Sequence, residues 1–290
     1  IVMSCRIVVV FLSGHCHELD VDQKDSIAQV KDVIASKWRI PQSCQRLLNA
    51  SSVEILDDSQ AIIPDQQYQL ILTVDDICKT IVRGCVEQCF IALRDLRVLS
   101  DTGYNCAASP DTFIAIFALI QQTKYADLRL EAVKTLAQIA TKGDCDVINP
   151  LLKQLSDIDC DVRIAVVQTI AQLAEKGDHD VINQLLGRLT HHDCTFRLQI
   201  VLAVGQLSAK GDRKVIDQLF ALLENEYPDM QLAAVRAIAQ IAEQGDQKVI
   251  DQFSRRLEHH GAHLQFFLES AIAQLSDDPT GIEFDGACFC

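Results

Sequence analysis

Cysteine and histidine are the residues of this chain best suited to metal binding or nucleophilic chemistry. The chain has 12 cysteines and 8 histidines among its 290 residues. Cys85 and Cys89 are spaced to share one face of a helix. However, no second pair of ligands follows them closely, and a structural zinc site needs four ligands. We therefore predict no metal site and interpret the cysteines as reduced structural residues.

The remaining patterns do not indicate catalysis. The chain contains no glycine-rich phosphate loop, nucleophile elbow or Ser/His/Asp set. The histidine pairs at 191–192 and 259–260 are 259 − 191 = 68 residues apart and suit ordinary turns. We expect no catalytic residues, no cofactor and no enzymatic activity.

The C-terminal tail, residues 281–290, carries two further cysteines. Cys288 and Cys290 have the spacing of a doubly prenylated tail. The four-residue prenylation motif is absent, because Ala287 occupies the position of its cysteine. We favour an incidental tail, and the role of the two cysteines is left open.

A period of 34 residues organises the second half of the chain, since 177 − 143 = 34. The Gly-Asp pair recurs at Gly143-Asp144, Gly177-Asp178, Gly211-Asp212 and Gly245-Asp246. Before each pair runs an alanine-rich stretch with apolar residues at three- and four-residue spacing, as in 127–140, which predicts an amphipathic helix. Glycine then ends this helix and aspartate caps a second one, as in 147–155. Such pairs must stack to bury their apolar faces, which predicts a helical solenoid, an architecture that usually binds proteins.

The residues of each unit suggest a family. The first helix opens with Asp161-Val162-Arg163, and the second reads Val-Ile-x-x-Leu-Leu from Val147. This pattern resembles HEAT repeats of the short, phycobilisome-lyase-like type. We expect HEAT-like helices over 77–280, with clear units at 126–260 and a terminal cap at 261–276.

The N-terminal stretch differs in kind. A β-rich run at 6–14, a second at 17–21 and an amphipathic helix at 25–34 predict strand, strand and helix. The helix, the turn Ile40-Pro41, the run 45–48, the acidic Asp57-Asp58 and the closing strand 68–74 resemble ubiquitin in order and spacing. The expected fold class is therefore an α+β β-grasp ubiquitin-like domain, residues 3–75, followed by an all-α HEAT-repeat solenoid.

The resemblance to ubiquitin has functional limits. Val74 runs directly into Asp75 without a diglycine terminus, so we expect a built-in domain and not a conjugated tag. The receptor-binding patch of ubiquitin would fall on Leu48 and Ile71. The alternative is that this face packs against the first helices of the solenoid.

Charge narrows the class of partner. The net charge is −14 and the isoelectric point is near 4.9, whereas nucleic-acid binders need a basic face. We expect protein partners with basic surfaces within a multi-subunit assembly, and no nucleic acid. No apolar run approaches the roughly 20 residues of a membrane span. The expected location is cytoplasmic by default; an organellar one stays open because Met3 is not the first residue.

These features favour a non-catalytic adaptor or scaffold subunit. The alternative is a chaperone-like or bilin-lyase-related HEAT factor that acts on a photosynthetic or other client protein. In a HEAT stack the second helices line the concave face, so we expect partner contacts at their solvent-side positions. These are Asn149, Asn183, Asp217 and Asp251, with Lys153, Arg188, Arg255 and Arg256 on an adjoining row.

A glutamine also recurs once per unit, at Gln138, Gln172, Gln206, Gln240 and Gln274. An amide both donates and accepts hydrogen bonds. We expect this row to be partly buried and to bridge neighbouring helices, with a polar binding stripe as the competing interpretation.

Overall fold

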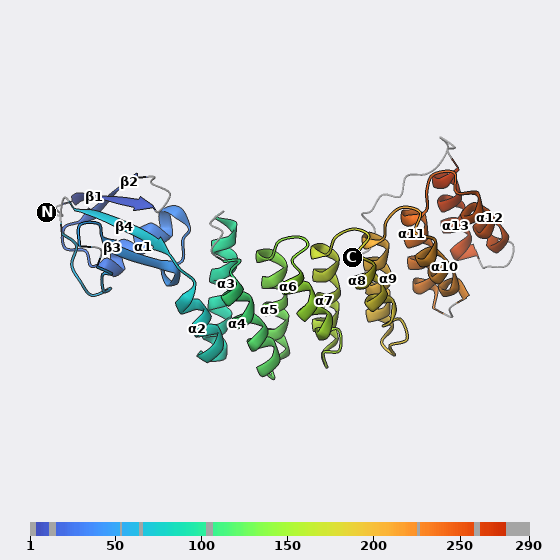
Figure 1. The fold of residues 1–290 in the computed structure, drawn as a ribbon, viewed down its shortest axis with the longest axis horizontal. Coiled ribbons are helices and arrows are strands. Elements are labelled where there is room, and N and C mark those ends of the chain that lie inside the picture. Colours follow the sequence, from blue (N-terminus) through green and yellow to red (C-terminus); the bar gives the residue numbers. More distant parts are fainter. Residues whose placement is uncertain are drawn as a thin grey trace. The chain divides into compact units, whose positions relative to one another are not determined.

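The computed structural model describes residues 4–11, 16–52, 54–63, 66–102, 107–224, 227–257 and 262–276. The chain divides into two compact units, Ile1–Thr141 and Lys142–Cys290 (Figure 1). The first unit holds a four-stranded sheet and helices α1 to α5, and the second holds helices α6 to α13. Each unit is described in turn.

The sheet of the first unit is mixed. Its strands are β1 (Ser4–Phe11), β2 (Cys16–Asp22), β3 (Gln45–Asn49) and β4 (Gln67–Leu72), in the order β2-β1-β4-β3. The central strands β1 and β4 are parallel, and each outer strand pairs antiparallel with its neighbour. Parallel strands need a long crossover, and the chain between β1 and β4 supplies one that includes α1 (Ile27–Trp38).

Helix α1 packs its apolar residues into the core of this sheet. Ser26 and Gln29 form a capping box at its start, which satisfies two backbone donors. Ile27, Val30 and Ile34 are buried together with Ile7 and Val9 of β1. Alternate strand residues point to the same face, so β1 contributes every second residue to this core.

Four helices complete the first unit. They are α2 (Asp75–Arg83), α3 (Val86–Asp101), α4 (Pro110–Gln122) and α5 (Ala126–Ile139). α2 packs on α3 and α4, and α5 packs on α3 and α4. The stretch at 77–100 thus forms parts of two helices, α2 and α3. Gly84 donates its amide to the Thr80 carbonyl at 2.7 Å and ends α2, and Gln88 bonds back to the Cys85 amide to start α3.

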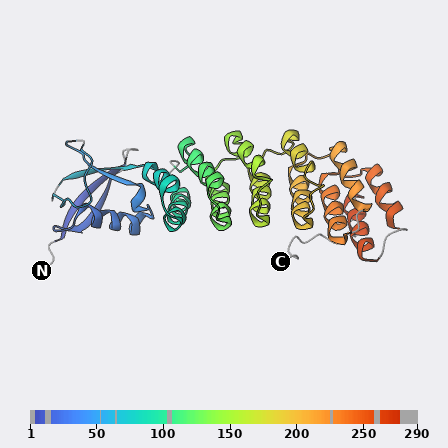
Figure 2. The same cartoon turned by 90° about the horizontal axis from the view of Figure 1, so that it is seen from below.

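The second unit is a two-layer stack of helices (Figures 1 and 2). One layer contains α7 (Cys160–Leu173), α9 (Cys194–Leu207), α11 (Pro228–Ile241) and α13 (Ala262–Leu275), which pack side by side in this order. The other contains α6 (Cys145–Gln154), α8 (His179–Leu186), α10 (Arg213–Phe220) and α12 (Gln247–Leu257), each packed on the helix that follows it. We call these the first-helix layer and the second-helix layer.

The Gly-Asp turns join the two layers. All four glycines have φ between +73° and +86°, a conformation that is costly for other residues. Each aspartate then caps a second helix through its side chain, as Asp144 does for the amide of Asp146 at 3.0 Å. Each glycine amide also donates to the carbonyl that ends the next first helix. These bonds are Gly143 to Leu173 (2.7 Å), Gly177 to Leu207 (2.6 Å), Gly211 to Ile241 (2.8 Å) and Gly245 to Leu275 (2.8 Å).

The glutamine row is exposed, which contradicts its expected partial burial. All five side chains lie on the outer side of their helices. The buried stripe of each first helix is already filled by apolar residues such as Ile170 and Val204, both 0% exposed. The expected bridge between helices is confirmed at Gln138, which donates from α5 to Asp101 Oδ1 of α3 at 2.7 Å, although this bond lies at the surface.

We predict that Gly245→Ala lowers the free energy of unfolding by about 1–2 kcal/mol, because an alanine would have to adopt a left-handed conformation. A Cβ at Gly245 meets nothing within 4 Å, so steric overlap does not contribute. Urea unfolding followed by circular dichroism measures the effect.

Gly187→Ala is the matched control. Gly187 has φ −60° and its added Cβ meets only carbonyl oxygens at 3.5 Å. This variant is expected to be neutral or slightly stabilising. Equal losses in the two variants would contradict the role of the positive φ.

Candidate protein-binding surfaces

The solvent-side residues of the second helices form one row. Asn149, Asn183, Asp217 and Asp251 lie one each on α6, α8, α10 and α12, and all are exposed. Lys214 Nζ reaches Asn183 Oδ1 from the next second helix at 3.2 Å. The structure therefore places these residues on successive helices of one layer, with acidic groups towards its C-terminal end.

The adjoining basic row is less uniform. Lys153, Arg188 and Arg255 are exposed. Arg256 is half-buried, with its guanidinium 5.2 Å from the centroid of the Phe220 ring and its Nη2 3.3 Å from Glu224 Oε1. Arg256 therefore contributes to packing within the unit, which leaves the other three as the solvent-facing cations of this row.

Two of the residues that follow a capping aspartate, His179 and Arg213, make contacts that the sequence analysis missed. Arg213 Nη2 lies 2.7 Å from Asp246 Oδ2, and His179 Nδ1 lies 3.5 Å from Asp212 Oδ2. Both carboxylates belong to the next Gly-Asp turn. The sequence does hold a signal for these contacts, because an aspartate stands 33 residues after each of the two positions, 212 − 179 = 246 − 213 = 33, one residue short of the period.

The arginine that opens the first helices is also structural. Arg163 donates to the carbonyls of Asp157 and Ile158, and its Nη2 lies 2.7 Å from Asp193 Oδ2 in the next unit of the repeat. The Cys160 Sγ is 2.8 Å from the same oxygen. This hydrogen bond, the Phe196 amide and the Arg163 guanidinium hold the pKa of Asp193 well below its usual range. The same bond raises the pKa of Cys160 to about 11, so this cysteine stays a thiol.

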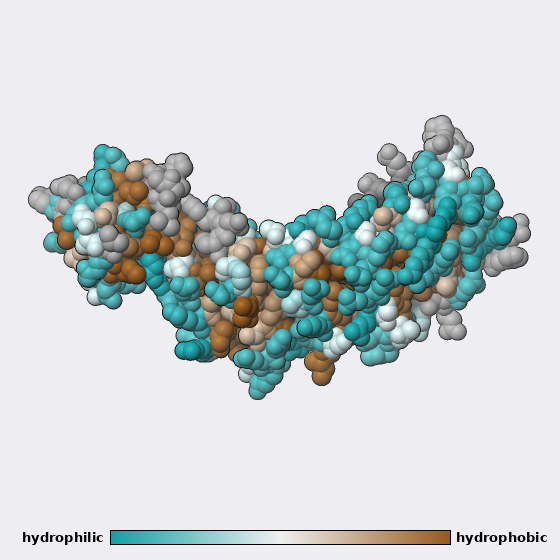
Figure 3. Space-filling view, in the orientation of Figure 1, coloured by the Kyte–Doolittle hydropathy of each residue, from teal (hydrophilic) through white to brown (hydrophobic). Residues whose placement is uncertain are grey.

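The face of the sheet expected to resemble a receptor patch is partly covered. Leu48 is 5% exposed because its strand pairs with β4 on one side and bridges to Ile55 on the other. It is therefore not the surface residue that the resemblance implied, and Ile71 is half-buried. The exposed apolar side chains here are Ile55 (62%) and Ile63 (53%). Figure 3 shows hydrophobic surface over this part of the chain.

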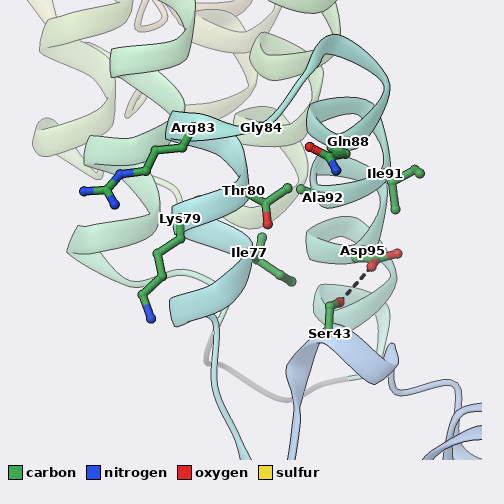
Figure 4. Close-up of a pocket in the computed structure, with 10 residues that line it drawn as sticks. All are labelled: Ser43, Ile77, Lys79, Thr80, Arg83, Gly84, Gln88, Ile91, Ala92 and Asp95. Atoms are coloured by element: carbon green, nitrogen blue, oxygen red, sulfur yellow. Dashed lines mark hydrogen bonds between the residues drawn. The ribbon is translucent and has the colours of Figure 1, made fainter. Parts of the chain in front are cut away.

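Within the first unit, the sheet region contacts α2 and α3. Ser43 Oγ donates to Asp95 Oδ2 at 2.7 Å, and Arg46 pairs with Asp76. Beside this contact is a pocket of about 470 Å³ (Figure 4). Lys79 and Arg83 point outward from α2 on one side, and Ile91 extends from α3 on the other.

The cysteine and histidine candidates do not converge in the described part of the chain. Among these residues no group of three or more His, Cys, Asp or Glu side chains could hold a metal. Cys89 is buried and donates to the Ile81 carbonyl at 3.5 Å, and burial raises its pKa. The pair at 259–260 and Cys288 and Cys290 lie outside the described residues. No described helix is long and apolar enough to cross a membrane.

Comparison with known proteins identifies the repeat. A family model for HEAT repeats matches residues 114–205 and 148–238. Residues 114–238 of this chain therefore match HEAT repeats. Such repeats generally mediate protein–protein interaction and scaffolding, and their fold is typically non-catalytic.

Two further comparisons add little. A solved structure titled an engineered protein is 18% identical, covers 70% of this chain and 96% of its own, and has a TM-score of 0.46. No curated protein matches the chain significantly.

We predict that Asp193→Asn lowers the free energy of unfolding by about 1–3 kcal/mol at neutral pH, because Arg163 loses its charged partner in a site where its side chain is 8% exposed. Asp161→Asn is the control, since Asp161 is exposed in the same first-helix layer. Urea unfolding of both variants measures the difference.

The pH dependence gives a second readout for the same pair. The folded pKa of Asp193 is depressed, so its stabilising effect is complete above the unfolded pKa of about 3.9. It is lost as the pH falls below that value. The difference between wild type and Asp193→Asn should therefore shrink as the pH falls from neutral to about 3. A constant difference would contradict a role for the carboxylate charge.

Proposed function

We propose that this protein is a non-catalytic adaptor or assembly subunit that binds other proteins through its helical repeats. The observation that carries the proposal is the second-helix layer, in which four exposed residues recur on successive helices of a HEAT-repeat stack. A row of this kind offers equivalent side chains along one line. A partner can therefore contact several repeats at once.

The N-terminal region is proposed to be a ubiquitin-like β-grasp domain at residues 3–75, followed by the repeats at 77–280 and the tail at 281–290. Support comes from the parallel pairing of β1 with β4, from the antiparallel outer strands and from α1 in the crossover. The contacts Ser43 to Asp95 and Arg46 to Asp76 favour a domain built into the chain. They also support the alternative in which the sheet face with Leu48 and Ile71 packs against the helices that follow it.

The charge of the second-helix row indicates the kind of partner. Asp217 and Asp251 are exposed, and the whole chain carries a net charge of −14. Opposite charges across an interface raise the association rate and exclude wrong partners. A partner with a basic surface therefore suits this end of the row.

The proposal is tested by purifying the tagged chain from its source and identifying the proteins that co-purify in stoichiometric amounts. The complex is then rebuilt from purified components and its stoichiometry is measured. A defined complex is the expected result. Multiple turnovers of a small molecule by the isolated chain, or no partner bound in stable proportion, would contradict an adaptor role.

We predict that the double variant Asp217→Lys with Asp251→Lys weakens the rebuilt complex about tenfold or more, because reversed charges repel a basic partner surface. Isothermal titration calorimetry measures the affinity. The control is Asp127→Lys with Asp161→Lys, which makes the same charge change at two exposed first-helix positions. Equal affinities for the two double variants would exclude the second-helix row as the contact.

A further inference from the structure

The first-helix layer of the second unit is hollowed by two neighbouring grooves that share one residue, Arg236. The first groove, of about 300 Å³, lies over α11 and α13 and includes Lys176, Lys210 and Arg236. The second, of about 320 Å³, lies over α9 and α11. It is lined by Leu198, Leu202, Leu232 and Ala233, together with Gln199, Asp229 and Arg236.

The first groove is basic in a strongly acidic protein. Its three charged lining residues are all cations, and the other polar ones are the exposed amides Gln240 and Gln274. Lys210 donates to the carbonyl of Ala242 at 3.0 Å, at the end of α11. Lys176 and Arg236 form no ion pair or hydrogen bond with any described residue. The charges of Lys176 and Arg236 are therefore not neutralised by an ion pair with a described residue.

Arg236 is not required by the repeat itself. The same position is occupied by Leu202 one period earlier and by Gln168 two periods earlier, since 236 − 202 = 202 − 168 = 34. Both neighbours stand in the same packed layer. Three periods earlier the position holds Lys134, so it accepts different residue types, and stacking does not require an arginine there.

Other cavities are weaker candidates. In the pocket beside Ser43, Lys79 is paired with Asp76 at 3.3 Å, and Asp95 contributes an acidic group to the lining. The charge of that pocket is therefore mixed. The first groove at Arg236 differs because all of its charged lining residues are cations. The second groove has one acid, Asp229, beside its apolar lining.

We propose that these two grooves together bind an acidic peptide segment of a partner protein. One apolar side chain of the segment occupies the groove lined by Leu198, Leu202 and Leu232. Carboxylates beside it pair with Lys176, Lys210 and Arg236. This inference rests on the proposed adaptor function, names a second surface for it, and gives that surface the opposite charge preference to the second-helix row.

Charge and shape both argue for this occupant. An arginine binds a carboxylate with two parallel hydrogen bonds, which adds geometric specificity. Among the residues that line the apolar groove, Leu232 is 7% exposed, and Leu198 and Leu202 are half-buried. A small apolar pocket bordered by a few polar groups is the common form of a recognition site.

The test uses the full chain and a fluorescein-labelled peptide with blocked ends, in which two leucines are placed among four glutamates. Fluorescence anisotropy measures its affinity. Binding should weaken about tenfold or more when the glutamates are replaced by glutamines, and similarly when the leucines are replaced by serines. It should also weaken as salt is raised, because the charges are screened.

Variants of the chain locate the site. Arg236→Leu copies the residue found one repeat earlier, so the fold is expected to be preserved, which thermal unfolding checks. Arg236→Leu with Lys176→Gln should weaken peptide binding about tenfold or more. The control is Lys134→Gln with Lys142→Gln, which removes two exposed cations that line neither groove and should leave binding unchanged. Equal effects of the two pairs, or no binding of the peptide at all, would overturn the inference.

The rebuilt complex separates this inference from the adaptor function. If the complex forms and Arg236→Leu with Lys176→Gln does not weaken it, while the peptide fails to bind, the groove assignment is wrong and the adaptor function stands. If the peptide binds at Arg236 but no stable complex forms, the groove assignment holds and the adaptor function fails.

Discussion

The hydrogen bond from each turn glycine to the end of the next first helix is the interaction on which the second unit depends. The last carbonyls of a helix have no partner within it. Here one of them, such as that of Leu207, accepts a hydrogen bond from the amide of Gly177 at 2.6 Å. The amide can point there because the glycine adopts φ +86°. This hydrogen bond gives the last carbonyl of the first helix a partner. It also fixes the spacing between that helix and the turn of the preceding repeat.

Because this backbone bond sets the spacing, side chains near it are free to vary. Cys145, His179, Arg213 and Gln247 occupy the same position after the capping aspartate. Two of them reach the next aspartate, yet none is required for the glycine bond. Function in such a chain is therefore found in the departures from the repeat. Arg236 departs from its equivalents in the second unit, Gln168 and Leu202, which are uncharged, although Lys134 of α5 is a cation.

The sequence predicted the repeat well because its period and its turn chemistry are local. Gly-Asp at a fixed interval predicts a helix end followed by a helix start, and the structure confirms both. The burial of individual side chains depends on contacts between segments that are distant in sequence. Leu48 is covered through its bridge to Ile55, and the exposure of Gln206 follows from the width of the apolar stripe. Neither can be read from the period.

The candidate surfaces show the same limit. Exposure of Asn149 and its equivalents followed from helical register alone, so it was predictable. The grooves at Arg236 could not be predicted in this way, because they form where turns and helices from several repeats meet. Lys176 and Gln274 line one groove, although 274 − 176 = 98 residues separate them.

The two proposed surfaces can act together in spite of the net charge of −14. At physiological ionic strength the electrostatic screening length is about 8 Å. A carboxylate that has reached the first groove therefore interacts mainly with the cations that line it, and only weakly with acids farther away than this length. The overall acidity acts on approach, where it favours basic partners. An acidic segment would consequently bind best as part of a larger partner whose basic surface has already made contact. Lys176, Lys210 and Arg236 would then increase the specificity of the bound complex and would not increase the association rate.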